Sequence, residues 1–206
     1  MSRALCHFVI TTFALLLLVA SAEAEEKLET AIFAGGCFWC VESDFDHVPG
    51  VIETISGYSG GTTTQNVTYK NHADAQHREV VKITFDANRI SYGELLDIYW
   101  RSVDPTDAGG QFCDRGHSYT TAIYTLTEDQ ANEAEASRNK LEASGVLSAA
   151  IATEIAPAKP FFEAEGYHQD YYNTNSIRYR YYRFACGRDD RVKEVWGPEA
   201  HKGIEK

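Results

Sequence analysis

Between Thr30 and Leu126, patterns typical of strands and helices follow one another in an order that few folds accommodate. Helical spacing of apolar residues is expected from Phe38 to Phe45, and again from the capping pattern at Ser91 to Trp100. Four strands are predicted where apolar residues run together or alternate with polar ones. They cover Thr30–Ala34, Val51–Tyr58, Glu79–Phe85 and Tyr119–Leu126. The resulting order is strand, helix, strand, strand, helix, strand.

This order is typical of the ferredoxin-like split β-α-β sheet, in which the helices pack on one face. A second capping pattern at Thr127 predicts a long polar helix to about Ser144, and another strand is expected near Ile151–Ile155. The predicted class is therefore α+β, followed by a long irregular C-terminal extension. We expect a single domain from residue 25 to residue 206, because no repeat or low-complexity linker divides the chain.

The first 24 residues resemble a secretory signal peptide. Arg3 is basic, Phe8 to Ala20 is almost wholly apolar, and an Ala-x-Ala pattern predicts cleavage after Ala24 or after Ala22. The apolar run is shorter than the roughly 20 residues that span a membrane. The chain is therefore expected to be exported, into the periplasm or the medium, where thiols are usually paired.

The charge balance excludes some classes of protein. Nineteen basic and 30 acidic residues give a net charge of −11, which argues against a nucleic-acid protein or a polybasic membrane-surface module. A zinc site is not expected, because Cys113 and Cys186 stand far apart and neither His72 nor His77 completes a familiar ligand pattern with them. We expect no metal or organic cofactor.

Chemistry concentrates in the segment Gly35–Cys40, which reads GGCFWC. A cysteine between a strand and the first turn of a helix lies beside free N–H groups and the positive end of the helix dipole. Both effects predict a lowered pKa and a nucleophilic thiolate at Cys37. Cys40 follows one turn later, within reach for a disulfide, and Trp39 can form the wall of an apolar pocket. The alternatives for such a pair are a buried core pair or a simple disulfide.

Glu79 alternates with Val81, Ile83 and Phe85, so its carboxyl is expected on the face of the strand that looks into the core. Burial would raise its pKa and suit it to act as a general acid. The alternative is a strand-end glutamate turned towards water. Taken alone, Tyr69, Asp114 and Tyr119 are ordinary loop residues. A tail rich in tyrosine and arginine is expected to pack over the domain.

Gly36-Cys37-Phe38-Trp39 resembles the active-site signature of the A-type peptide-methionine sulfoxide reductases, which act on the S epimer of methionine sulfoxide. Further blocks in family order cover about Thr30 to Gly197. They include Phe45–Val51, Gly57–Gly61, Thr68-Tyr69, His77–Glu79, Asp104–Thr106, Gln111, Asp114–Gly116, Tyr119, Thr153–Ile155, Phe161–Glu165 and Tyr167–Gln169.

The resemblance implies a role for each matching position. Cys37 would attack the sulfoxide sulfur, and Glu79 would protonate its oxygen. The oxygen-binding partners would be Tyr69, Asp114 and Tyr119, and the methyl group of the substrate would lie against Phe38 and Trp39. A second thiol would convert the resulting sulfenic acid into a disulfide, which a thioredoxin-like dithiol would reduce.

The chain departs from the familiar family pattern at its other cysteines. Cys40 occupies a position where glycine is common, and Cys186 lies in the segment RFACGR rather than in a glycine-rich tail. Both Cys186 and Cys40 are candidates for the resolving cysteine, with Cys186 slightly favoured, and Cys113 is expected to be structural.

The expected partners are methionine sulfoxide in proteins or peptides and a thioredoxin-like reductant, with no nucleic acid and no stable membrane association, and the chain is expected to be a monomer. One alternative is an exported thioredoxin-like oxidoreductase that uses Cys37 and Cys40 as its redox pair. Another is a binding module for methionine-rich partners.

Overall fold

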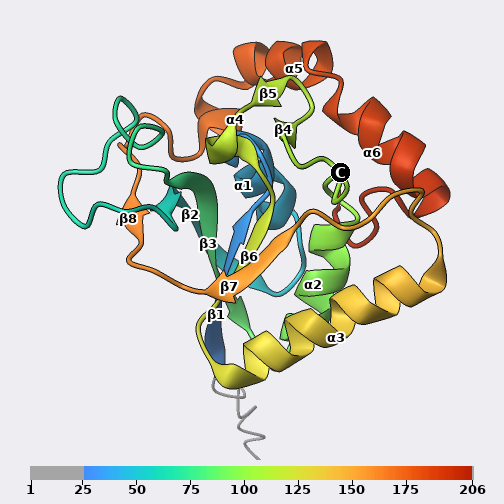
Figure 1. Cartoon of the computed structure of the whole chain (residues 1–206). Coiled ribbons are helices and arrows are strands. Elements are labelled where there is room, and N and C mark those ends of the chain that lie inside the picture. The colour runs from blue at the N-terminus through green and yellow to red at the C-terminus, as the bar shows by residue number, and fades with distance from the viewer. Residues whose placement is uncertain (1–25, 206) are drawn as a thin grey trace, which may run out of the picture.

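The computed structural model describes residues 26–205 and is built on a six-stranded sheet (Figure 1). Its strand order is β7-β6-β1-β3-β2-β8, and all pairs are antiparallel except β6 with β7. The strands are β1 (Leu28–Ala34), β2 (Val51–Ser59), β3 (Arg78–Asp86), β6 (Ala122–Thr125), β7 (Glu154–Pro157) and β8 (Phe162–Glu163). The predicted signal peptide lies outside the described residues.

The four central strands confirm the ferredoxin-like arrangement. β1 lies between β6 and β3, and β2 follows β3, as expected of two interleaved strand-helix-strand units. Helix α1 (Phe38–Asp46) joins β1 to β2, and α2 (Tyr92–Trp100) follows β3. Both helices lie on the same face of the sheet (Figure 1).

Two boundaries differ from the sequence prediction. Tyr119 lies in the 3-10 helix η1 (His117–Tyr119) and not in a strand, because the chain turns at Gly116 with φ 106°. The strand predicted near Ile151 begins later, at Glu154. A separate two-stranded sheet, β4 (Gly110–Gln111) and β5 (Asp114–Arg115), precedes η1.

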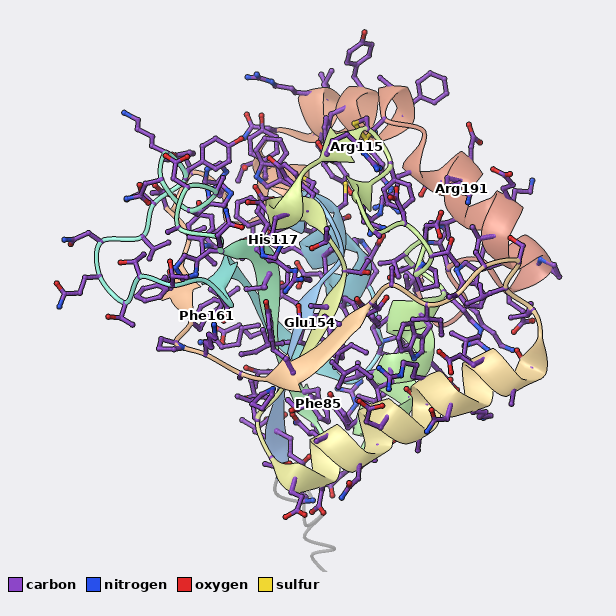
Figure 2. The ribbon with its side chains drawn as sticks, viewed as in Figure 1. Phe85, Arg115, His117, Glu154, Phe161 and Arg191 are labelled. Carbon is purple, nitrogen blue, oxygen red and sulfur yellow. A yellow bond between two sulfur atoms is a disulfide. The ribbon has the colours of Figure 1, made fainter. Side chains whose placement is uncertain are left out.

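The main core lies between the sheet and the two helices. Phe33 of β1 is fully buried, with its ring 5.5 Å from that of Phe45 and 4.8 Å from that of Tyr99. The opposite face carries a smaller apolar cluster, against which Phe161 packs (labelled in Figure 2). Burial on both faces explains why the end of β1 is continuously apolar.

The predicted polar helix is confirmed as α3 (Glu128–Ser144). Thr127 caps its N-terminus by accepting a hydrogen bond from the Gln130 N–H, and Gly145 ends it in the left-handed conformation. It packs on α2, where the Trp100 indole donates to Ser137. None of the described helices combines the length and apolar character needed to span a bilayer.

The C-terminal extension is more regular than the sequence suggested. It forms α4 (Tyr171–Thr174), α5 (Ser176–Ala185), α6 (Arg188–Trp196) and the 3-10 helix η2 (Gly197–Glu199), and in Figure 1 α5 and α6 run over the top and side of the domain. Buried Arg188 anchors α6 by donating to the carbonyls of Gly35 and Ser102. Tyr179, Arg183 and Arg188 hold these helices to the domain through burial and tertiary partners that sequence periodicity does not reveal.

Replacing Ser91 by Ala should lower the free energy of unfolding by about 1 kcal/mol. The Ser91 side chain accepts from the Glu94 N–H at 3.2 Å, while the Glu94 carboxylate accepts from the Ser91 N–H at 2.9 Å. Urea denaturation measures the loss. Replacement of the exposed Ser148 by Ala is the control and should change stability by less than about 0.5 kcal/mol; equal effects of the two changes would contradict the capping assignment.

Candidate active site

A cavity of about 70 Å³ at the start of α1 gathers every catalytic and substrate-binding residue that the sequence predicted. Residues that lie far apart in the chain meet there because several elements converge at this point. They are the end of β1, the loop before β3, the start of β3 and η1. The lining residues are Cys37, Phe38, Trp39, Tyr69, Glu79, Asp114, Tyr119 and Tyr182. A larger cavity, of about 550 Å³, lies elsewhere and contains none of the predicted residues.

Cys37 is the N-cap of α1 and follows a turn that only glycine fits. Gly36 has φ +87°, and a Cβ atom there would lie 2.7 Å from the Cβ of Gln111. This close approach allows β1 to turn directly into α1, so the Cys37 side chain enters the cavity at the first turn of the helix.

Glu79 is buried beside Cys37, as its alternation in the strand predicted. One carboxylate oxygen accepts the N–H of Phe38 at 2.9 Å. Burial raises the pKa of Glu79 to about 8, the Phe38 hydrogen bond opposes this rise, and the nearby charge of Asp114 adds to it. The carboxyl therefore carries a proton at neutral pH and can donate it.

The pKa of Cys37 shifts in the direction opposite to the sequence prediction. Burial raises the pKa of its thiol above the ordinary value, and a hydrogen bond to Cys40 adds to the rise. The helix start does not reverse this effect, because the Phe38 N–H points to Glu79. The hydrogen bond that Cys37 donates to Cys40 lowers the pKa of the Cys40 thiol. The positive charges of Arg188 and Arg183 lower it further. The negative charge of the pair is therefore favoured on Cys40.

Trp39 forms a fixed aromatic wall. Its ring stacks on Tyr171 with centroids 3.8 Å apart and planes 9° from parallel, and its indole N–H donates to Nδ1 of His168 at 3.0 Å. Phe38 packs 5.8 Å from the ring of Tyr58. Stacking and hydrogen bonding hold both rings in place, so an apolar surface faces the thiol.

The tyrosines of the cavity remain hydrogen-bond donors. Burial raises the pKa of both Tyr69 and Tyr119, and a hydrogen bond links these two side chains. Burial also raises the pKa of Asp114, while a hydrogen bond from Tyr182 opposes that rise. The cavity thus presents hydroxyl groups and one proton-bearing carboxyl to any oxygen bound near Cys37.

Tyr182 is the cavity residue that sequence reasoning missed. It lies on α5, and its hydroxyl donates to a carboxylate oxygen of Asp114. In the sequence it is one of several tail tyrosines. Its spacing of three residues from the buried Tyr179 is the only signal that could have singled it out.

The cysteines pair differently from the favoured expectation. Cys186 forms a disulfide with Cys113, with Cα atoms 4.9 Å apart, whereas Cys37 and Cys40 are free and buried. Cys186 is therefore not available as a free thiol to Cys37 in this structure. A bonded pair of sulfurs also lacks the thiolates that would ligate a metal beside Asp114.

Comparison with known proteins agrees with this geometry. The family model described as peptide methionine sulfoxide reductase matches residues 29–200. A peptide methionine sulfoxide reductase, MsrA 2, of Rhizobium meliloti is 52% identical over 204 residues, covering 99% of each chain. The MsrA of Bacillus subtilis is 48% identical over 174 residues, covering 84% of this chain and 98% of that one.

Solved structures show the same fold. Methionine sulfoxide reductase A of Corynebacterium diphtheriae is 33% identical, with a TM-score of 0.64 over 73% of this chain and 76% of that one. Reduced Mxr1 of Saccharomyces cerevisiae is 27% identical, with a TM-score of 0.66 over 73% and 87%. Fold, family match and sequence identity together establish that the chain belongs to the A-type peptide methionine sulfoxide reductase family.

Proposed function

We propose that this chain reduces the S epimer of methionine sulfoxide in proteins and peptides to methionine, as a repair enzyme for oxidative damage. One observation carries the proposal: a buried thiol, a protonated carboxyl and an aromatic wall face one cavity. Membership of the reductase family supports the same activity.

In the proposed reaction Cys37 attacks the sulfoxide sulfur. The sulfur of Cys40, which accepts a hydrogen bond from Cys37, takes its proton as the bond to the sulfoxide sulfur forms, because bond formation makes the Cys37 proton far more acidic. Glu79 protonates the sulfoxide oxygen, while Tyr69, Asp114 and Tyr119 bind and polarise it. The oxygen ends on Cys37 as a sulfenic acid, methionine leaves, and the enzyme has lost two electrons.

Phe38 and Trp39 are proposed to hold the terminal methyl group of the substrate. Both rings are fixed by neighbouring aromatic residues, and sulfur–aromatic contacts are favourable. The apolar wall on one side and the oxygen-binding groups on the other would distinguish the methyl group from the oxygen. This distinction is what selection of one epimer requires.

Cys40 is the better-supported resolving cysteine. It hydrogen-bonds to Cys37, whereas Cys186 is bonded to Cys113. Its lowered pKa favours the nucleophilic thiolate. Attack of Cys40 on the sulfenic acid forms the Cys37–Cys40 disulfide and releases water. An external thioredoxin-like dithiol then restores both thiols by exchange, so the cycle draws its electrons from thiols.

The setting of this activity is also proposed. Residues 1–24 read as a signal peptide, so the mature chain would work in the periplasm or outside the cell, as a monomer, without a prosthetic group. The electron donor would then be an exported dithiol protein.

Thiol–disulfide exchange through Cys37 and Cys40 is the alternative, but it leaves the buried carboxyl unexplained. Exchange needs no proton donor to an oxygen, and Glu79 lies beside the thiol with a pKa of about 8. A binding module for methionine-rich partners has no use for the thiol pair either.

Residues 25–206, supplied with excess dithiothreitol, should release methionine from the S epimer of N-acetylmethionine sulfoxide and not from the R epimer. Chromatography of the product measures the release, and replacement of Cys37 by Ser should abolish it. Reduction of insulin disulfides without turnover of either epimer would instead assign the chain to thiol–disulfide exchange.

Replacing Cys40 by Ser should stop the cycle at the sulfenic acid. One methionine per chain is still released, but turnover supported by thioredoxin falls at least about 100-fold, because no second thiol is in place to form the disulfide. Trapping with dimedone and mass spectrometry detects the Cys37 sulfenic acid. In the comparison variant, Cys186→Ser, repeated thioredoxin-supported turnover should persist without accumulation of the sulfenic acid, whatever its rate; accumulation in Cys186→Ser and not in Cys40→Ser would make Cys186 the resolving cysteine.

The rate of a single reduction cycle should decline above about pH 8, because Glu79 loses its proton as the pH passes its pKa. Below that pH the carboxyl is protonated and the proton donor is present. Glu79→Gln should lower the rate by about 10²- to 10⁴-fold and remove this alkaline limb. Rates from pH 6 to 10 test this, with the exposed Glu142→Gln as control; an unchanged alkaline limb in Glu79→Gln would assign it to another group.

A further inference from the structure

We propose that Tyr182 is a positioning residue for Asp114, and that the Cys113–Cys186 disulfide holds the two side chains together. On this view the second disulfide assembles the active site and takes no part in electron transfer. The inference rests on the proposed reductase function, because it concerns the oxygen-binding side of the same cavity.

Tyr182 makes three contacts inside the site. Its hydroxyl donates to Asp114, and its ring meets the Trp39 ring edge-on with centroids 5.8 Å apart. The same hydroxyl oxygen lies within hydrogen-bonding reach of the Cys37 side chain. It therefore joins the reactive thiol, the aromatic wall and the oxygen-binding carboxyl through one side chain.

The disulfide lies immediately beside this contact on both segments. Cys113 directly precedes Asp114, and Cys186 follows Tyr182 by one helical turn, its N–H donating to the Tyr182 carbonyl at 2.9 Å. The Cys113 N–H points to the Cys186 sulfur at 3.2 Å, and that sulfur lies 3.8 Å from the Asp114 carboxylate. The covalent bond thus ties the carboxylate-bearing segment to the hydroxyl-bearing helix.

Each segment has other contacts, but these lead to other parts of the fold: Arg115 pairs with Asp107, and Arg183 of α5 pairs with Asp44 of α1. Asp114 belongs to β5, which pairs only with the two-residue strand β4. α5 exposes much of its apolar surface, including Phe184, which is 80% exposed. Figure 2 shows the yellow sulfur–sulfur bond beneath α5, near Arg115 of β5. Two short elements that meet at the surface need a tether to hold a side-chain contact in one geometry.

The hydroxyl of Tyr182 has an electrostatic consequence for the proton donor. By donating to Asp114 it opposes the rise that burial causes in the pKa of that carboxyl, and it holds the ionised carboxylate in place. That charge helps to raise the pKa of Glu79. The titratable or charged groups around Asp114 and Glu79 are Cys37 and Cys40 at the start of α1, Tyr69 and His72 of the loop before β3, Tyr119 of η1, Tyr182 of α5 and Arg188 of α6.

Tyr182→Phe tests the hydroxyl, and Tyr181→Phe is its matched control on the same helix, because the Tyr181 side chain is 74% exposed. The assay is a single cycle without external reductant, started from full-length mature chain with Cys37 and Cys40 reduced and Cys113–Cys186 intact by mass. Tyr182→Phe should lower the single-cycle kcat/KM about 10- to 100-fold, as expected for a lost hydrogen bond to a charged group. It should also move the alkaline limb near pH 8 to lower pH, because an Asp114 charge that is no longer held in place supports the protonated form of Glu79 less.

The double variant Cys113→Ala/Cys186→Ala tests the tether. Its single-cycle kcat/KM should also fall. Adding Tyr182→Phe to this variant should lower kcat/KM little further, because both changes act through the position of Asp114. Amide exchange of residues 110–119 and 176–186 should accelerate while that of β1 and β3 does not. Thermal unfolding of each variant sets an assay temperature at which all are folded.

The outcomes separate this inference from the proposed function. Wild-type chain that reduces neither epimer refutes the function. Active wild type with Tyr182→Phe equal to Tyr181→Phe overturns the inference alone. A double cysteine variant with a normal single-cycle rate but no thioredoxin-supported turnover also overturns it, because the second disulfide would then carry electrons. If the double variant does not fold, the comparison of Tyr182→Phe with Tyr181→Phe still tests the inference.

Discussion

The hydrogen bond from the Phe38 N–H to the buried Glu79 carboxyl is the contact on which the site depends. It joins the start of α1 to β3 and so sets the proton donor beside the residue that follows Cys37. The same contact uses the helix-start N–H group that would otherwise favour a Cys37 thiolate. Acid and nucleophile are therefore coupled: the carboxyl keeps its proton through burial, and the thiol keeps its own for the same reason.

Cys40 carries the negative charge that burial disfavours on Cys37. It lies one turn along α1, accepts the Cys37 hydrogen bond, and feels the positive charges of Arg183 and Arg188 from the C-terminal helices. Arg183 pairs with Asp44 of α1 at 2.8 Å, which fixes it against that helix. The extension thus supplies both the charge that tunes Cys40 and, through Tyr182, a wall of the cavity. It is part of the active site as well as a cover for the domain.

The two cysteine pairs of the described chain differ in their surroundings. Cys37 and Cys40 are buried, are free and share one hydrogen bond, so they suit a redox cycle. Cys113 and Cys186 are bonded to each other at the edge of the site, between the segment that carries Asp114 and the end of α5. This separation allows the second pair to stay oxidised while the first is repeatedly oxidised and reduced.

Local sequence determined the strand–helix order, the caps at Ser91 and Thr127 and the inward side of Glu79, because apolar periodicity and capping act within a few residues. Only tertiary structure decided the pKa direction of Cys37, the disulfide partner of Cys186, the helices of the extension and the place of Tyr182. Each of these depends on burial or on contacts between segments that lie tens of residues apart, such as Tyr182 with Asp114. Periodicity in the sequence carries no information about such distances.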